Sequence, residues 1–227
     1  MKTIVLFDLD GTLVLTGGAG RRALDRAFVD VCGCPDALSS IQFGGMTDRA
    51  IARIGLRAAG WDETLENMER VLGRYLEHLR EEVRRSEGYR IMPGVLELLD
   101  QLGQNSDVGL GLGTGNIERG AEIKLVRGDL FHRFAFGGFG SDAEDRAELL
   151  LFGVERGAAY LGTRVSECRV VVVGDTPRDI DAAKAIGAAC VAVATGGHTV
   201  DELRASGAPV AVSDLSQSET LAAIVGL

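Results

Sequence analysis

Short apolar segments recur along the chain, and each of them ends in glycine or polar residues. They read TIVLFD, VGLGLGTGN, RFAFGGFG, RVVVVGDT, AACVAVATGG and APVAVSD, and they begin at residues 3, 108, 133, 169, 188 and 208. Segments that stay apolar from one position to the next are typical of strands whose two faces are both covered. The pattern therefore predicts a buried, parallel β-sheet.

Helical patterns lie between these strands, over 93–103, 116–131, 142–162 and 176–187, and a last one follows Ser216. The helix at 93–103 opens with a proline and closes on a glycine, as helices commonly do. Alternating strands and helices imply right-handed crossovers. The expected fold class is α/β, with a doubly wound, Rossmann-like parallel sheet.

The segment over 15–88 differs, because it shows helical patterns with no strand between them. One amphipathic stripe on it is formed by Leu65, Met68, Val71, Leu72, Tyr75, Leu76, Leu79 and Val83. Such a stripe is typical of a helix that packs one face against a core. The sequence therefore predicts a core domain of residues 1–14 and 89–227, with a helical cap domain of residues 15–88 inserted after the first strand.

Composition and charge narrow the class of partner. The 227 residues are 46% hydrophobic and 25% charged, with a net charge of −9, which is typical of a globular protein and gives no general attraction to nucleic acid or anionic membrane. The cysteines at 32, 34, 168 and 190 form no C-x-x-C pattern, so free thiols and a cytoplasmic location are expected. The sequence leaves monomer or homodimer open.

Polar residues gather where the predicted strands end, and ligands of open parallel sheets bind beyond those ends. They are Asp8, Asp10 and Thr12, then Thr114, Gly115 and Asn116, then Asp142, Glu144, Asp145 and Arg146, then Asp175, Thr176 and Asp179. A single such group carries little weight, since a GDT sequence after a strand is often only a helix N-cap. Their combination predicts one site at this edge.

The motifs DLDGT, GTGN and VVVGDTPRDI resemble motifs one, two and four of the haloacid dehalogenase (HAD) superfamily. The position of the insertion resembles the helical-cap subgroup, with phosphoglycolate phosphatase-like members nearest. This resemblance implies a Mg²⁺-dependent phosphatase. Its partner is expected to be a small-molecule phosphate ester, hydrolysed through an aspartyl-phosphate intermediate.

The resemblance also implies a role for each residue of these motifs. Asp8 is the expected nucleophile, and Asp10 is the expected general acid and base. Magnesium prefers oxygen ligands, which Asp8, the backbone carbonyl of Asp10 and Asp175 are expected to supply. Asp179 is expected either to bind the metal or to orient it from behind the ligands.

Phosphate binding is expected from Thr114 and from the glycine-rich turns around it. Thr114 would hydrogen-bond the phosphoryl oxygens, and the other expected phosphate-binding residues are Gly11, Thr12, Gly115 and Asn116.

The chain departs from the family pattern at motif three, which is normally a lysine ahead of a helix. The lysines of this chain are Lys2, Lys124 and Lys184. Arg146, within GSDAEDRAELL, lies where the lysine is expected and keeps its positive charge, with a planar fork suited to phosphate or carboxylate. We expect Arg146 to fill the role, with Lys124 as the second candidate. The third interpretation is that neither contributes and Arg146 forms a surface ion pair.

Two related reactions fit the sequence poorly. Residues 14–88 contain no lysine for the Schiff base of phosphonate-cleaving relatives, and Asp10 argues against carbon–halogen cleavage. A β-phosphoglucomutase-like phosphosugar mutase stays open as the alternative, and a non-catalytic binding protein of this fold is a weaker one. In the cap, the stretch FGGMTDRAI over 43–51 is the expected substrate contact, with Arg49 as its candidate anion-binding side chain.

Overall fold

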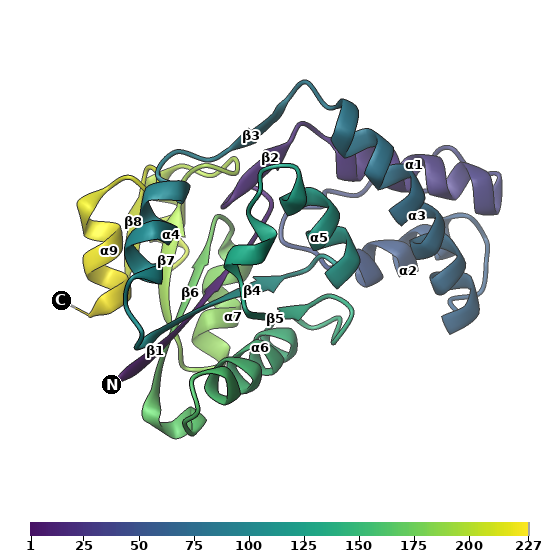
Figure 1. The fold of residues 1–227 in the computed structure, drawn as a ribbon. Helices are drawn as coiled ribbons and strands as arrows, with labels where there is room; N and C mark the ends of the chain where they lie inside the picture. The colour runs from purple at the N-terminus through teal and green to yellow at the C-terminus, as the bar shows by residue number, and fades with distance from the viewer. Residues whose placement is uncertain (227) are drawn as a thin grey trace.

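The computed structural model describes residues 1–226 and is built around a six-stranded parallel sheet in the order β5-β4-β1-β6-β7-β8 (Figure 1). The strands are β1 (Lys2–Phe7), β4 (Val108–Thr114), β5 (Phe136–Phe139), β6 (Cys168–Gly174), β7 (Ala189–Val193) and β8 (Val210–Val212). Strand β1 is central and pairs with β4 on one side and β6 on the other. The predicted α/β, doubly wound fold class is confirmed.

Helices cover both faces of this sheet, as the apolar strand pattern predicted. Along β1, Ile4 and Leu6 face one layer, and Val5 and Phe7 face the other. The first layer contains α6 (Arg146–Tyr160), α7 (Pro177–Ala185) and α8 (Val200–Ala205). The second contains α4 (Val95–Gly103), α5 (Glu118–Val126) and α9 (Ser218–Val225).

Two local features depart from the predicted elements. The helix predicted over 116–131 ends at Val126, and Asp129 takes a positive φ of 54° before the short 3-10 helix η1 (Phe131–Arg133). Helix α8 was not predicted; it begins after Thr199, whose side chain forms a capping box with Glu202. A second 3-10 turn, η2 (Val165–Glu167), precedes β6.

The inserted segment forms its own hydrophobic cluster from α1 (Ala19–Cys32), α2 (Asp48–Ala58) and α3 (Leu65–Arg85), which Figure 1 shows beside the sheet domain. A short antiparallel ribbon links the two parts, with β2 (Val14–Thr16) paired to β3 (Tyr89–Ile91). The predicted boundaries at 14/15 and 88/89 fall within or beside this ribbon. No helix among residues 1–226 is long and apolar enough to cross a membrane.

Two helical glycines of the cap, Gly55 and Gly73, differ in how closely their surroundings are packed, and substituting each by alanine tests this packing. A methyl group on Gly55 would lie 2.3 Å from Cζ of the buried Phe28, whereas one on Gly73 would meet no atom within 4 Å. We expect Gly55→Ala to lower the free energy of unfolding by about 1–3 kcal/mol through overpacking. We expect the control Gly73→Ala to raise it by about 0.5–1 kcal/mol. Urea denaturation measures both, and equal effects of the two substitutions would contradict this packing.

Candidate active site

Asp8 begins the site directly after the central strand. Its backbone N–H donates to the carbonyl of Val173 on β6 at 2.8 Å, and only 5% of the residue is exposed. The chain then turns at Gly11, whose φ is 89° and whose place leaves no room for a side chain. A Cβ there would lie 2.4 Å from Oδ2 of Asp175. The glycine of the first motif therefore lets the turn close onto the aspartate that follows β6.

Three buried carboxylates lie together at this edge of the sheet. Asp8, Asp175 and Asp179 each place an oxygen within 4.8 Å of the others. Arg146, the first residue of α6, reaches between two of them. Its Nη2 lies 3.1 Å from Oδ1 of Asp8, and its Nε donates to Oδ1 of Asp179 at 2.9 Å. The guanidinium therefore lies against Asp8, the expected nucleophile. Arg146 is also the residue at the sequence position where the motif-three lysine was expected.

Burial dominates the electrostatics of this cluster. It raises the pKa of Asp8 to about 6, although the Arg146 guanidinium acts in the opposite direction. Burial and the neighbouring Asp8 and Asp179 raise the pKa of Asp175 well above its usual range. Three carboxylates facing one guanidinium make a site where a further cation is stabilising. A cluster of oxygen donors of this kind fits Mg²⁺.

Two hydroxyls orient members of the cluster. Thr12 donates from Oγ1 to Oδ1 of Asp175 at 3.1 Å; it is fully buried and does not itself line the cavity between core and cap. Asp179 accepts from the N–H of Thr176 at 3.0 Å and from its hydroxyl at 2.8 Å, through Oδ2. Both oxygens of Asp179 therefore have donors, since Arg146 holds Oδ1. These contacts favour an orienting place for Asp179 behind the metal ligands.

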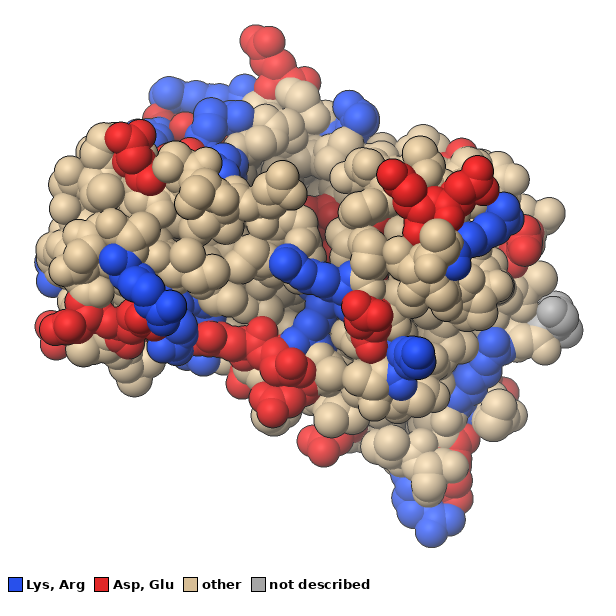
Figure 2. Space-filling model, turned by 180° about the vertical axis from the view of Figure 1, so that it is seen from behind, with Lys and Arg blue, Asp and Glu red and all other residues tan. Residues whose placement is uncertain are grey.

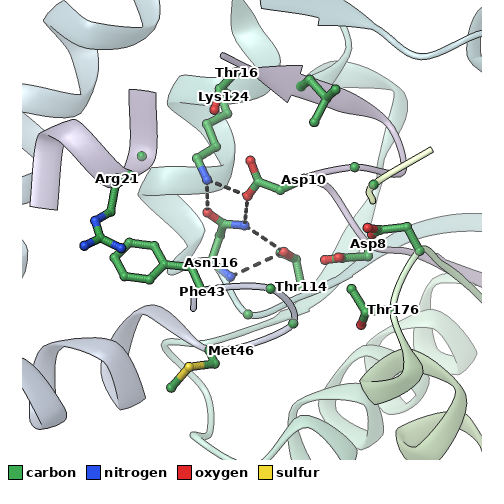
Figure 3. A pocket seen from close by; sticks show the side chains of 18 of the residues that line it. Asp8, Asp10, Thr16, Arg21, Phe43, Met46, Thr114, Asn116, Lys124 and Thr176 are labelled. Carbon is green, nitrogen blue, oxygen red and sulfur yellow. Dashed lines mark hydrogen bonds and ion pairs between the residues drawn. The ribbon is translucent and has the colours of Figure 1, made fainter. Parts of the chain in front are cut away.

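A second group of polar side chains surrounds Asp10 (Figure 3). The Nζ of Lys124 donates to Oδ2 of Asp10 at 2.5 Å and to Oδ1 of Asn116 at 2.6 Å. The Nδ2 of Asn116 donates to Oδ2 of Asp10 at 2.9 Å and to Oγ1 of Thr114 at 2.9 Å. Both cations that the sequence offered for motif three are thus in the site, but on different carboxylates.

A cavity of about 460 Å³ lies between these groups and the cap. The core contributes Asp8, Asp10, Gly11, Thr114, Gly115, Asn116, Lys124, Arg146 and Asp175, and the cap side contributes Arg21, Phe43, Met46, Asp48, Ile51 and Tyr75. Of the predicted cap stretch 43–51, several residues line the cavity, but Arg49 is not among them.

Arg21 is a cavity residue that the sequence analysis did not single out. It stacks over the ring of Phe43, with its guanidinium carbon 4.6 Å from the ring centroid (Figure 3). It also donates to the carbonyls of Ile41 at 3.0 Å and Leu38 at 2.7 Å. Its first role is therefore to hold the loop that carries Phe43. No spacing in the sequence links residue 21 to residue 43, so only the folded cap brings them together.

The cap contacts the core at the entrance to the cavity. The N–H of Asp48 donates to the carbonyl of Gly115 at 2.8 Å, and the Asp48 carboxylate accepts from the N–H of Ile117 at 2.9 Å. Beside them, Arg53 pairs with Glu144 at 2.6 Å. Two hydrogen bonds therefore connect the first turn of α2 to the loop that follows β4.

The buried Asp48 carboxylate predicts a pH-dependent stability. Burial raises its pKa from 3.8 to about 6, while Lys124 and the N–H of Ile117 oppose the shift. The folded state thus binds this proton more tightly than the unfolded chain. Its contribution to the free energy of unfolding is greatest at low pH and is lost as pH rises through about 6.

Asp48→Asn keeps an oxygen acceptor and removes the titration. We expect the variant to gain stability over the native chain as pH rises from 4 to 8, by up to about 3 kcal/mol. Urea unfolding at each pH, with chelator present, measures this difference. Asp62→Asn is the control because Asp62 is exposed on the same domain. A stability difference that does not change with pH would contradict the expectation.

The sequence of this chain is similar to those of known hydrolases and phosphatases. Residues 5–193 match the family model described as haloacid dehalogenase-like hydrolase. The chain is 30% identical over 229 residues to the probable phosphatase IndB of Dickeya dadantii, covering 96% of this chain and 92% of that protein. It is 33% identical over 208 residues to the phosphoglycolate phosphatase of Pseudomonas syringae pv. tomato, covering 86% of this chain and 71% of that protein.

A solved structure agrees with these relatives. The crystal structure of a hydrolase from Pseudomonas syringae has a TM-score of 0.68 to this chain at 25% identity, with 95% of each chain covered.

Proposed function

Because the chain belongs to the haloacid dehalogenase-like hydrolase family, we propose that it is a Mg²⁺-dependent phosphatase of a small, phosphoglycolate-like phosphate ester. The observation that carries the proposal is the placement of two carboxylates with different cations at one cavity. Asp8 is buried against Arg146, and Asp10 is held by Lys124 with 41% of its side chain exposed. The two aspartates are therefore suited to different steps.

In the first step, a carboxylate oxygen of Asp8 attacks phosphorus and the bond to the leaving oxygen breaks. Asp10 gives its proton to that oxygen, so that the alcohol leaves neutral and Asp8 carries the phosphoryl group. The hydroxyl of Thr114 and the N–H groups of the loop after β4 are placed to hold the phosphoryl oxygens. Arg146 keeps the nucleophile oriented and offsets part of its charge.

In the second step, water attacks the phosphorus of the aspartyl phosphate. Asp10, now a carboxylate, takes a proton from that water, and the bond between phosphorus and Asp8 breaks. Inorganic phosphate leaves and Asp8 returns to its starting state. Both steps transfer a phosphoryl group in line, so placement and charge neutralisation supply most of the rate.

Asp8, Asp175 and the backbone carbonyl of Asp10 are the groups that would hold Mg²⁺, with Asp179 orienting Arg146 behind them. The ion supplies charge neutralisation at the phosphoryl oxygens when bound. Without it, the raised pKa of Asp8 leaves part of the nucleophile protonated at neutral pH.

The proposed partner is a small molecule. The cavity of about 460 Å³ is lined by cap residues on one side, and its size suits a compact leaving group. Figure 2 shows basic side chains interspersed with acidic ones on the face drawn, and the net charge is −9, both of which disfavour nucleic acid. A cytoplasmic location, argued from the spacing of the four cysteines, is part of the proposal.

The first test is phosphate release from phosphoglycolate, other small esters and p-nitrophenyl phosphate, with Mg²⁺ and with chelator. We expect release that needs Mg²⁺ and that falls by at least about 10⁴-fold in Asp8→Asn, because the nucleophile is removed. Asp201→Asn is the matched control, since its side chain is 97% exposed. Isomerisation of a hexose phosphate without net phosphate release would instead support the mutase alternative.

A second test separates Arg146 from a purely structural ion pair. Arg146→Met leaves Asp8 among buried carboxylates without its guanidinium, so we expect kcat to fall by about 10²–10³-fold. Arg146→Lys keeps the charge and should lose less. Steady-state phosphate release measures both, with Arg119→Met as control because Arg119 is 72% exposed. A native kcat in Arg146→Met would remove this residue from the mechanism.

A further inference from the structure

Lys124 is buried within the site, yet its ammonium bonds to Asp10 and Asn116, whereas the nucleophile Asp8 pairs with Arg146. Its side chain is 5% exposed and reaches from the last turn of α5 to Asp10. Arg146 already occupies the place beside Asp8 and Asp179. Because a buried ammonium needs partners, the contacts of Lys124 indicate what it does.

The ammonium of Lys124 fixes which way the Asn116 amide points. An ammonium only donates, so the atom of Asn116 that lies 2.6 Å from it must be the amide oxygen. The amide nitrogen is then turned toward Oδ2 of Asp10 and Oγ1 of Thr114, and both of these atoms accept from it. Figure 3 shows this as one connected set of hydrogen bonds.

The amide orientation in turn fixes the hydroxyl of Thr114. Its oxygen accepts from Nδ2 of Asn116 at 2.9 Å and from the backbone N–H of Asn116 at 3.3 Å. A hydroxyl has two lone pairs and one proton. With both lone pairs occupied, the proton of Thr114 is the part left to point into the cavity, where a phosphoryl oxygen would accept it.

The same lysine also fixes the two oxygens of Asp10. Oδ2 accepts from Lys124 and from Asn116, and within residues 1–226 no hydrogen bond reaches Oδ1. Two donors hold negative charge on Oδ2. These donors therefore fix the orientation of the Asp10 carboxyl group through Oδ2 and leave Oδ1 for the substrate.

We propose that Lys124 is a positioning residue that acts through Asn116, turning the Thr114 hydroxyl toward the phosphoryl group and holding the carboxyl group of Asp10 by its Oδ2. This role is separate from that of Arg146 and rests on the proposed phosphatase function. Gly20 of the cap packs beside this lysine, since a Cβ there would lie 3.4 Å from Nζ, an ordinary contact distance. The lysine therefore couples proton transfer to phosphate binding.

Lys124→Met tests this by keeping the length of the side chain and removing its donors. We compare kcat and KM for p-nitrophenyl phosphate and for an alkyl ester such as phosphoglycolate. A phenolate leaves readily without a proton, whereas an alkoxide does not. We expect kcat for the alkyl ester to fall by about 10²–10³-fold and that for the aryl ester at least about tenfold less, with KM changing little.

Lys184→Met is the matched control, because Lys184 is an exposed lysine of α7. An equal loss for the two esters in Lys124→Met would indicate a structural role only and would overturn the proposal. Should this variant fail to fold, Asn116→Ser removes the bridge and leaves the lysine in place, and the same unequal loss is expected.

A measurement that needs no turnover tests the positioning role of Lys124 independently of the proposed phosphatase activity. In the free protein, the side-chain amide signals of Asn116, assigned with Asn116→Ser, report its hydrogen bonds by NMR. We expect Lys124→Met to shift them and speed their exchange with solvent, and Lys184→Met to leave them unchanged. Unchanged signals in Lys124→Met would overturn the positioning role. Absent phosphate release from the native chain would overturn the phosphatase assignment alone.

Discussion

Carboxylate repulsion at the end of β1 is the constraint on which the rest of the site depends. Asp8, Asp175 and Asp179 are nearly removed from water, and each places an oxygen within 4.8 Å of the others. Charges buried in this way are costly unless each finds a donor or a counter-ion. Residues of the same motifs supply these donors. Thr12, close to Asp8 in the sequence, donates to Asp175, and Thr176 donates to Asp179. One guanidinium then leaves net negative charge, which is what makes the cluster a place for a metal ion.

The second carboxylate system is organised differently because it faces the cap. Asp10 and the buried Asp48 approach Lys124 from opposite domains, and the lysine lowers the pKa of Asp48 against the effect of burial. The ammonium of Lys124 therefore favours the charged forms of both Asp10, in the core, and Asp48, in the first turn of α2. The two cations lie on different carboxylates: Arg146 pairs with the buried Asp8, and Lys124 pairs with the partly exposed Asp10.

The sequence predicted the residues that lie next to a strand end better than those that meet through tertiary packing. Asp8, Asp10 and Asp175 follow apolar strands and Thr114 ends one, and parallel strands bring such positions to one edge. The apolar strand pattern predicted the α/β sheet, and the resemblance of three motifs predicted the family; both are confirmed. It ranked Arg146 above Lys124, but it could not predict that both would lie in the site on different carboxylates, because that depends on how α5 and α6 pack.

The cap shows the limit of sequence reasoning most clearly. Within 43–51 the analysis selected Arg49 for its charge, whereas the cavity receives the ring of Phe43 and the side chain of Met46. Helix α2 begins at Asp48, and its orientation decides which of these residues face inward. Arg21 lines the cavity because α1 packs beside the same loop, a contact that no local pattern encodes.

The way the cap meets the core also bears on the size of the leaving group. Backbone meets backbone at this contact, since a Cβ on Gly115 would lie 2.3 Å from the carbonyl oxygen of Met46. The N–H of Asp48 bonds the same glycine, so the cap approaches the phosphate-binding loop with no side chain between them. A long substrate would have to part this contact, whereas a compact one lies beneath it. Under the proposed function, the close approach that Gly115 permits would favour a small ester over a long one.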